Sequence, residues 1–430
     1  MKEKNLILNI IWLVILFVIP LPLIVLLNLN LIASVRDLIV YDFGVLAYVW
    51  WLTITYLSLR PKWLDRLIGL PSMYLVHGLL GLLALIAATL HKFLSFSFDQ
   101  NVKNTGNIAW YLVVFGFFYA AFFMSGWLIN YFKVADTLKR RLNHLFKHQL
   151  SVWIHRLNLV AIALIFLHVQ LITRISSITE FIILFDLYSA IVVVLYVINK
   201  IILMNRINGI VIANKKLNDD TQQLQVKLKG HKRTYSAGDF YFISFENVSG
   251  LGIESHPFSV SSAPRLETNI VSFTIQDVGD FTQKISTIPL NTRVKMEGPF
   301  GLFNKLIKSE SKGAPLVLWG LGTGIAPLLS IAKEYAGTRS IHVIWTAQSR
   351  DKLYYSNEFK ELEQKYNNFK YFEKIHRIKS DEFKNILSTN EIKTGHFYIV
   401  GPSRAIIDLE DELNSFGISR KKLNDERMTL

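Results

Sequence analysis

The feature that most constrains this chain is a set of six apolar segments in its first half. A helix that crosses a lipid bilayer needs about 20 predominantly apolar residues. The segments are Leu6–Leu27, Tyr41–Leu59, Ser72–Leu94, Ile108–Phe132, Val152–Thr173 and Thr179–Met204. Because every backbone polar group has to be bonded within the membrane, they predict a bundle of six spanning helices over residues 1–205.

Two of these segments carry a histidine near each end. His77 and His91 stand 14 residues apart in the third segment, and His155 and His168 stand 13 apart in the fifth. At helical rise these steps are roughly 21 and 20 Å, within a hydrocarbon core of about 30 Å. Ionisable side chains inside a membrane are costly and call for a partner or a function. Neutral imidazole is a common ligand of haem iron, so the four histidines predict two bis-histidine haems, one above the other.

The helical phase of the two histidine pairs differs. A step of 14 residues returns to within about 40° of the same helix face, whereas a step of 13 ends about 140° away. The fifth segment is therefore either locally distorted or presents its two histidines at different azimuths. Any one histidine alone could be an interfacial or hydrogen-bonded residue, but two pairs at nearly equal spacing favour ligands.

Basic residues cluster on one side of the membrane if the six segments alternate in direction. They are Lys2, Lys4, Arg60, Lys62, Arg66, Lys133, Lys139, Arg140, Arg141, Lys147, Lys200 and Arg206. The positive-inside rule then predicts a multi-pass protein of the cell membrane with both termini in the cytoplasm. His77 faces His155 in the inner leaflet, and His91 faces His168 in the outer one. We interpret the net charge of +14 as membrane-orienting charge and a site for anionic cofactors, not as nucleic-acid binding.

Several classes of site and signal are excluded or disfavoured. The chain has no cysteine, which excludes disulfides, thiolate ligation of haem and cysteine-ligated iron–sulfur clusters. It has no cleavable signal pattern and no calcium-binding loop, so we expect activity without calcium or an obligatory cytosolic activator. Asp136–Leu150 predicts a basic amphipathic helix on the inner membrane surface. His144 and His148 in it could bind a metal, but a solvated face is favoured because no third ligand is near.

The second half of the chain has the pattern of two soluble domains. Short alternating strands at Gln223–Leu228, Asp239–Phe245, Ile270–Gln276 and Thr292–Glu297 predict an antiparallel barrel over residues 206–312. Over residues 313–430 strands alternate with helices, at Leu316–Trp319, Pro327–Tyr335, Ile341–Trp345, Gly395–Val400 and Ser403–Phe416. This alternation predicts a parallel-sheet nucleotide-binding domain.

Four motifs in this half carry chemistry. In His256–Pro264, small hydroxyls and an aromatic ring are spaced to place Ser259 by the edge of a flavin and Phe258 on its ring system. In Gly279–Thr282, a glycine turn that opens a helix offers free N–H groups to a diphosphate. Gly298–Gly301 is a turn that lets two domains approach. Gly320–Pro327 follows an apolar strand and precedes a helix, the context of a phosphate-binding glycine loop.

Together and in this order, the motifs resemble the dehydrogenase half of the NADPH oxidase and ferric reductase family. The six spans with two histidine pairs resemble its transmembrane half, as in bacterial NADPH oxidase-like flavocytochromes b. The resemblance implies a membrane α-helical six-span bundle with two haem b groups, joined to a cytosolic ferredoxin-reductase-like module that binds FAD and NADPH. It assigns His256, Pro257, Phe258, Ser259, Ser262, Gly279 and Thr282 to FAD, and Gly320, Gly322, Thr323, Gly324, Pro327, Gly401 and Pro402 to the nicotinamide nucleotide.

Two positions depart from the family pattern. The family usually has Cys-Gly-Pro near the nicotinamide, where this chain has Val400-Gly401-Pro402. The family often ends on an aromatic residue that shields the flavin, whereas this sequence ends Arg427-Met-Thr-Leu430. Both departures concern the organisation of hydride transfer.

The resemblance implies an enzyme that moves electrons from cytosolic NADPH through FAD and two haems to an acceptor outside. Oxygen giving superoxide is the favoured acceptor, and a ferric chelate or an outside partner protein are alternatives. The outer loops Asn28–Val40, Lys92–Asn107 and Arg174–Thr179 carry no dense acidic or metal-ligand cluster, which favours a small diffusing acceptor. A haem-binding membrane anchor or transporter with an inactive reductase is the alternative from another class.

The choice of nucleotide depends on the end of the strand Ile341–Trp345. In this family that end lies beside the adenosine ribose, where an arginine accommodates a 2′-phosphate. Ser349 and Arg350 occupy the place, and a planar guanidinium suits phosphate. Asp351 could instead pair with Arg350 or accept from a ribose hydroxyl. We expect a preference for NADPH with NADH tolerated.

Overall fold

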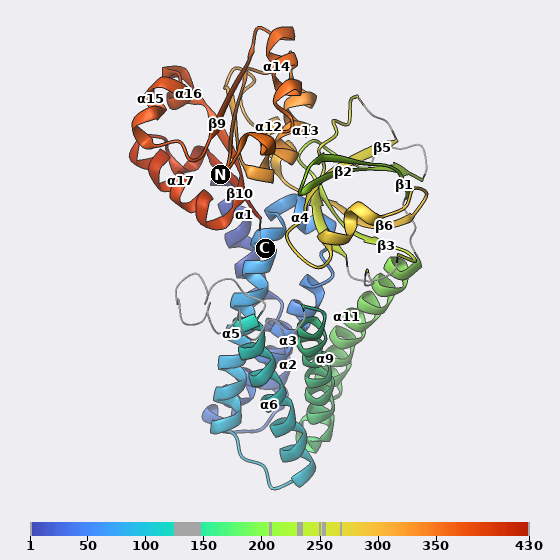
Figure 1. Ribbon diagram of the computed structural model, residues 1–430. Coiled ribbons are helices and arrows are strands. Elements are labelled where there is room, and N and C mark those ends of the chain that lie inside the picture. The colour runs from blue at the N-terminus through green and yellow to red at the C-terminus, as the bar shows by residue number, and fades with distance from the viewer. Residues whose placement is uncertain are drawn as a thin grey trace. The chain divides into compact units, whose positions relative to one another are not determined.

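A computed structural model describes residues 2–123, 148–205, 209–229, 235–248, 251, 255–266 and 269–428 (Figure 1). The chain forms two compact units, which are described separately. One unit comprises residues 4–64 and 70–202, and the other comprises residues 203–430 together with Asp65–Gly69.

The first unit is helical throughout its described part. Its elements are α1 (Lys2–Leu13), the π-helical η1 (Val14–Val18), α2 (Leu21–Asn30), α3 (Val35–Leu57), the start of α4 (Lys62–Ile68), α5 (Leu70–Leu94), α6 (Gln100–Phe123), α9 (His148–Leu171), α10 (Thr173–Ser176) and most of α11 (Thr179–Asn205). Within the described residues, six stretches are long and apolar enough to cross a membrane. The six predicted spans are therefore confirmed, except that the end of the fourth, residues 124–132, lies outside the described part of the chain.

Two of the spans begin six or more residues earlier than the sequence predicts. The second begins at Val35 instead of Tyr41, because the Ser34 hydroxyl caps the helix by accepting from the Asp37 N–H at 3.2 Å. The fourth begins at Gln100 instead of Ile108, after an Asp99 carboxylate that accepts from the Asn101 N–H at 2.7 Å. Hydropathy marks only the apolar part of a helix, whereas side-chain caps extend it through polar turns. The predicted helix 136–150 with His144 falls outside the described residues up to position 147.

Apolar packing and a few polar pairs join these helices. Helix α3 runs along α5, and α6 runs along α9. The ring of Tyr48 stacks on Phe185 at 4.6 Å, inside a cluster contributed by α2, α3 and α11. The Asn28 amide donates to the Asp42 carboxylate at 2.9 Å, and the Gln170 amide to Asp186 at 2.7 Å. Such amide–acid pairs satisfy polar groups that lipid cannot.

The second unit contains the predicted antiparallel barrel. Its strands are β1 (Gly209–Asn218), β2 (Thr221–Leu228), β3 (Phe240–Phe245), β4 (His256–Ser259), β5 (Ile270–Gln276) and β6 (Arg293–Phe300), in the order β4-β3-β6-β1-β2-β5. A bridge between Val260, just after β4, and Phe273 on β5 closes the sheet. Buried apolar residues from all six strands or their flanks fill its centre.

Two strands and one strand end were not predicted. Strand β1 directly follows the sixth span, so its apolar residues have no separate periodic signal. Strand β4 is the His256–Ser259 motif itself, which pairs with β3. Strand β6 extends to Phe300 and includes most of the predicted turn Gly298–Gly301.

The remainder of the second unit is the predicted α/β domain. Its parallel strands are β7 (Leu316–Leu321), β8 (Ile341–Ala347), β9 (Phe369–Ile375), β10 (His396–Pro402) and β11 (Leu423–Met428), in the order β11-β10-β7-β8-β9. Its helices are α12 (Phe303–Ser309), α13 (Ile325–Tyr335), α14 (Ser356–Lys365), α15 (Phe383–Ile386), α16 (Thr389–Thr394) and α17 (Ser403–Ser415). Strands β9 and β11 were not predicted, since charged residues interrupt their apolar pattern.

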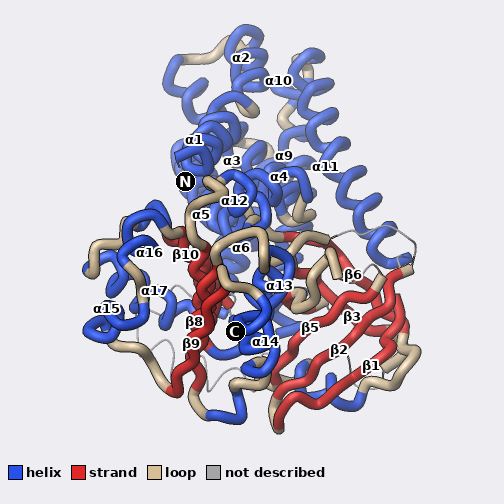
Figure 2. Tube along the Cα trace, turned by 90° about the horizontal axis from the view of Figure 1, so that it is seen from above, coloured by secondary structure: helices blue, strands red, loops and turns tan. Residues whose placement is uncertain are grey.

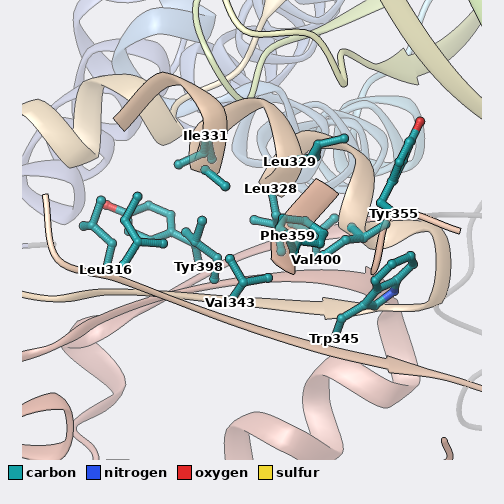
Figure 3. Packing of buried hydrophobic residues seen from close by; sticks show 14 of the residues in the cluster. Leu316, Leu328, Leu329, Ile331, Val343, Trp345, Tyr355, Phe359, Tyr398 and Val400 are labelled. Carbon is teal, nitrogen blue, oxygen red and sulfur yellow. The ribbon is translucent and has the colours of Figure 1, made fainter. Parts of the chain in front are cut away.

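Alternate residues of these strands face two separate clusters. Leu316, Val343, Trp345 and Tyr398 pack against α13 and α14 (Figure 3). Their neighbours Val317, Trp319, Ile344 and Phe397 pack on the other side with α15 and α17. Figure 2 shows the two groups of helices on opposite faces of the sheet. A parallel sheet covered on both faces explains the continuous apolar runs in β7 and β8.

The barrel and the α/β domain contact each other inside this unit. The Ser330 hydroxyl of α13 donates to the Ser262 carbonyl at 2.6 Å, and the Gln223 amide of β2 donates to the Tyr355 hydroxyl at 3.0 Å. The Lys352 ammonium lies 2.8 Å from the Asp220 carboxylate in the β1–β2 turn. These contacts hold the two domains as one body.

A buried histidine–carboxylate pair stabilises the second face of the sheet. His342 Nδ1 and Glu391 Oε1 are 3.0 Å apart, with side chains 6% and 5% exposed. The other Glu391 oxygen accepts from the Ser388 N–H and hydroxyl. Burial by itself raises the pKa of Glu391, but His342 and Ser388 outweigh it and lower the pKa to about 2.

The low pKa of Glu391 predicts an acid-sensitive contribution to stability. Because the folded pKa lies below the usual 4.5, this contribution is complete above about pH 5 and is lost as pH falls towards 2. We expect Glu391→Gln to destabilise the protein by about 3 kcal/mol at pH 7 and by much less at pH 3. Chemical denaturation of the full chain in detergent measures this. Glu361→Gln, an exposed position on α14, is the control, and a pH-independent deficit would contradict the prediction.

Candidate functional site

The predicted glycine loop lies at the point where the strand order reverses. Strand β7 ends in the loop, η3 (Gly322–Gly324) follows, and α13 begins at Ile325. A Cβ on Gly324 would lie 2.1 Å from the Val400 carbonyl oxygen of β10, and a Cβ on Gly401 would lie 2.6 Å from Leu321 Cβ. The loop and the end of β10 therefore approach so closely that only glycine fits. Ligands of open α/β sheets bind at such switch points.

A cavity of about 460 Å³ opens beside this loop. Of the predicted nucleotide residues, Gly322, Thr323 and Pro402 line it. Gly320, Gly324 and Gly401 lie where the neighbouring chain segments approach closely, and Pro327 is buried in α13. Ser349 and Arg350 do not line it; Arg350 is exposed in η4 (Arg350–Lys352). The cavity has the size of a small-molecule site.

Three cations that the sequence analysis did not single out line the cavity, namely Lys352, Arg377 and Arg404. Arg377 follows β9 and pairs with the Asp408 carboxylate at 2.8 Å. Burial raises the pKa of Asp220, but hydrogen bonds from Lys352, Gln276 and Thr221 bring it below its usual range. The sequence analysis did not identify Arg377 because it had not predicted β9, the strand that Arg377 follows. Together the three cations make the cavity suitable for a phosphorylated ligand.

The predicted flavin motif forms an aromatic platform on the barrel. His256, Pro257, Phe258 and Ser259 make up β4, paired with β3. The Phe281 ring lies 4.0 Å from the His256 ring and stacks 6.1 Å from Phe258. Phe281 is thus a further member of this group, and it sits inside the Gly279–Thr282 motif that the sequence analysis had quoted for its backbone only.

Two predicted contacts are already satisfied within the protein. The N–H of Gly279, expected to be free for a diphosphate, donates to the Thr282 hydroxyl at 2.9 Å, which corrects that expectation. Thr282 closes the turn by donating back to the Gly279 carbonyl at 3.0 Å. The Ser262 hydroxyl is buried, accepts from the Ser272 N–H at 3.0 Å and bonds the Tyr235 hydroxyl at 3.0 Å. Its observed contacts join β5 to the chain beyond β4.

In the helical unit the four histidines meet in two pairs. The ring centroids of His77 and His155 are 6.0 Å apart, and those of His91 and His168 are 6.3 Å apart. Two imidazoles that face each other across one metal, at metal–nitrogen distances of about 2 Å, have centroids roughly 6 Å apart. Helix α9 is α-helical from end to end, so the alternative of a local distortion is excluded and its histidines lie at different azimuths.

Backbone carbonyls hold the rings of His91 and His168 in a fixed orientation. Nδ1 of His91 donates to the Val40 carbonyl at 2.8 Å, and Nδ1 of His168 donates to the Val102 carbonyl at 2.9 Å. Such bonds fix the tautomer in which Nε2 is the metal-binding nitrogen. The residues present therefore fit a bis-histidine metal centre at the His91–His168 pair, and the ring separation of 6.0 Å fits one at the His77–His155 pair.

Glycines on neighbouring helices make room for these rings. A Cβ on Gly44 of α3 would lie 3.0 Å from His91 Nδ1, and a Cβ on Gly106 of α6 would lie 3.1 Å from His168 Cε1. At the other pair, Gly116 accommodates the Asn158 amide, which lies 3.4 Å from His155 Nδ1. These glycines gave no signal in the sequence, because their partners lie on other helices.

Comparison with known proteins matches two parts of the second unit. An FAD-binding domain matches residues 207–304, and an oxidoreductase NAD-binding domain matches residues 318–409. The chain is 26% identical to NADPH oxidase 1 of Rattus norvegicus, over 32% of this chain and 24% of that protein. It is 29% identical to ferric reduction oxidase 2 of Arabidopsis thaliana, over 32% and 19%. It is 32% identical to respiratory burst oxidase homolog protein B of Oryza sativa subsp. japonica, over 34% and 19%. The chain thus spans at most about a quarter of the length of these relatives.

The close approach of the backbone at Gly324 predicts that alanine substitution there has a much larger effect than alanine substitution at Gly279. A Cβ at Gly324 would collide with backbone, whereas a Cβ at Gly279 meets nothing within 4 Å. We expect Gly324→Ala to destabilise the α/β domain by about 1–3 kcal/mol or more and to weaken nucleotide binding at least tenfold. Gly279→Ala is expected to stay within about 0.5 kcal/mol of the parent. Thermal unfolding and nucleotide titration measure both, and equal effects of the two variants would contradict the steric argument.

Proposed function

The chain belongs, by its FAD- and NAD-binding domains, to the NADPH oxidase and ferric reductase family, and we propose that it transfers electrons from NADPH across a membrane. The acceptor lies on the opposite side. The reductase domains face the cytoplasm, as do both termini, and the membrane is the cell membrane. The basic clusters at alternate ends of the spans support this orientation.

The observation that carries the proposal is the pair of histidine contacts inside a bundle of spanning length. His77 and His91 are separated by 14 residues of one continuous helix, roughly 21 Å. Each meets a histidine of α9. A soluble reductase does not need two such sites at different depths in one helix bundle. Their arrangement suits the transfer of electrons across the apolar layer of a membrane.

Haem held at each histidine pair would supply a one-electron carrier. The imidazoles act as neutral ligands, and the Val40 and Val102 carbonyls keep two of them in the orientation that presents Nε2. Gly44 and Gly106 allow α3 and α6 to pack against the rings and exclude lipid from them. The chain thereby sets the order and spacing of the two sites.

In the reductase unit, the chain's residues bind and orient the two nucleotides. The cavity at the carboxyl end of β7 would receive NADPH, and Thr323 and the N-terminus of α13 would bind its phosphates. Pro402 forms the wall that the family's Cys-Gly-Pro would form, with Val400 in place of the cysteine. Phe258, Ser259 and Phe281 would hold the flavin on the barrel, where the Phe258 and Phe281 rings stack at 6.1 Å, and Phe258 and Ser259 would be the residues that orient its reacting ring.

Oxygen, giving superoxide, is the acceptor that we propose. The connections expected on the outer side are short, over residues 31–34, 95–99 and 172–178. A stable protein partner needs roughly 800 Å² of surface, which short turns supply poorly, whereas oxygen diffuses to the buried pair. A ferric chelate is the second candidate, because ferric reduction oxidases are among the relatives. Superoxide dismutase decides between them: it should abolish cytochrome c reduction by the purified protein, and insensitivity would favour the chelate.

The two histidine pairs should be separable by substitution. We expect His77→Leu or His155→Leu, and likewise His91→Leu or His168→Leu, to remove about half of the bound haem and to abolish reduction of the outside acceptor. NADPH-dependent reduction of a soluble dye should persist, since the flavin domain contains none of these residues. The checks are haem content, dithionite difference spectra and the dye assay, with Tyr74→Leu on the exposed face of α5 as the control. Full haem content in the histidine variants would refute the ligand assignment.

The preference for NADPH over NADH can be used to test which of two arginines, each following one of two neighbouring strands, binds the 2′-phosphate. We propose that Arg350, after β8, reads the 2′-phosphate of NADPH, and that Arg377, after β9, which lines the cavity as Arg350 does not, is the alternative reader. The His376 N–H donates to the Ala347 carbonyl at 2.7 Å, so the two loops are adjacent. Arg350→Ala should cost about 1.5–3 kcal/mol with NADPH and little with NADH.

The same assay applied to Arg377→Ala shows which loop holds the phosphate. Arg420→Ala, an exposed position paired with Asp411 outside the cavity, is the matched control. The measurement is kcat/KM for both nucleotides in the dye assay. Equal losses for NADPH and NADH in Arg350→Ala would show that Arg350 does not read the 2′-phosphate, and a selective loss only in Arg377→Ala would assign the phosphate to the β9 loop.

A further inference from the structure

Three of the four paired histidines are hydrogen-bonded to backbone groups. Both rings of the His91–His168 pair donate to backbone carbonyls, and the His77 ring is bonded to the backbone of Ile54. Nδ1 of the fourth ring, that of His155, faces a side chain instead. It lies 3.4 Å from Nδ2 of the Asn158 amide. The two histidine pairs therefore differ in the kind of group that surrounds their rings.

The Asn158 amide is enclosed between α9 and α6. It follows His155 by three residues, so the two side chains lie on one face of α9. A Cβ on Gly116 of α6 would lie 2.5 Å from Oδ1, 2.9 Å from Nδ2 and 3.0 Å from Cγ of the amide. Because all three atoms press on this position, only glycine leaves the amide its place. Gly116 is thus required by Asn158.

A second polar contact joins the same two helices one turn before His155. The hydroxyls of Ser151 on α9 and Tyr119 on α6 are 3.0 Å apart and buried. Hydrogen bonds between spanning helices fix how the helices pack against each other. His155 therefore stands between two polar contacts along the line where α6 and α9 meet, and its position on α9 is fixed on both sides.

The Asn158 amide has one atom that the described residues leave unused. Its Oδ1 is buried and has no hydrogen-bond partner in the described part of the chain. A half-turn of the amide exchanges the places of Oδ1 and Nδ2. A histidine that binds a metal through Nε2 carries its proton on Nδ1, so Nδ1 is then a donor. With Oδ1 turned towards His155, this donor meets an acceptor and the buried oxygen gains its partner.

We propose that Asn158 is a positioning residue of the His77–His155 site, with its amide oxygen as the acceptor for Nδ1 of His155. The inference rests on the proposed function, because it takes Nε2 of His155 as a haem ligand. An acceptor on Nδ1 fixes the orientation of the ring and raises the basicity of the ligand nitrogen. A more basic ligand favours the ferric state of haem iron, so the acceptor lowers the reduction potential of this site.

The nature of the acceptor makes the two sites respond differently to substitution. At His91 and His168 the acceptors are the backbone carbonyls of Val40 and Val102, which remain when a side chain is replaced. At His155 the acceptor is a side chain, so one substitution removes it. The structure therefore predicts that the residue at position 158 sets the potential of one site and leaves the other unchanged.

The experiment measures haem affinity and the potentials of both haems in the purified full-length protein. Leucine and aspartate both have nearly the shape of asparagine, but only aspartate keeps an oxygen acceptor, whether or not it is protonated. Asn158→Leu should weaken haem binding at the His77–His155 site by roughly 10- to 100-fold. At saturating haem it should raise the potential of that site by at least a tenfold change in the reduction equilibrium, about 59 mV for one electron.

The aspartate variant and the second site separate this role from a general loss of structure. Asn158→Asp should bind haem within about threefold of the parent, with a potential no higher than that of the parent. In both variants the haem of the His91–His168 site should keep its affinity and its potential. The affected haem is identified as the one that is lost in His155→Leu.

Two glycine variants give a matched comparison. Gly116→Ala should reproduce the effect of Asn158→Leu, because a Cβ there displaces the amide. Gly78→Ala, next to His77, adds a Cβ that meets nothing within 4 Å and should change neither affinity nor potential.

Each outcome separates this inference from the proposed function. Unchanged affinity and potential in Asn158→Leu, an equal effect at both sites, or an Asn158→Asp variant that behaves like Asn158→Leu would each overturn it. A parent protein that takes up no haem would overturn the proposed function together with this inference. A parent that takes up two haems whose properties do not depend on position 158 would overturn the inference alone.

Discussion

The cost of placing an ionisable ring in an apolar bundle is the constraint on which the membrane half depends. Each imidazole needs a defined partner for Nδ1 and a second for Nε2. The backbone carbonyls of Val40 and Val102 meet the first need for two rings, and the facing histidine at about 6 Å leaves room for a metal, which would meet the second. The helices can approach closely enough for this only because glycines stand opposite His91 and His168.

The same principle of close backbone approach governs the reductase unit. Gly324 and Gly401 bring the loop after β7 against the end of β10, and the cavity opens where these two segments diverge. Its wall carries cations from segments that are distant in sequence, at Lys352, Arg377 and Arg404. The parallel sheet assembles them because the carboxyl ends of all its strands lie at one edge. The presence of these three cations at one cavity is thus a consequence of the strand order.

The sequence by itself determined the six spans, the two-domain reductase and the order of its motifs, because hydrophobic period and glycine turns are local signals. It also selected His77, His91, His155 and His168, since a polar ring in an apolar run stands out. It missed β1, β4, β9 and β11, the glycines that face the histidines, and the place of Arg377 in the cavity wall. Only the tertiary structure decided those, because each depends on a partner far away in the chain. Gly44 matters only opposite His91 and Arg377 only beside the cavity, and no local pattern records such distances.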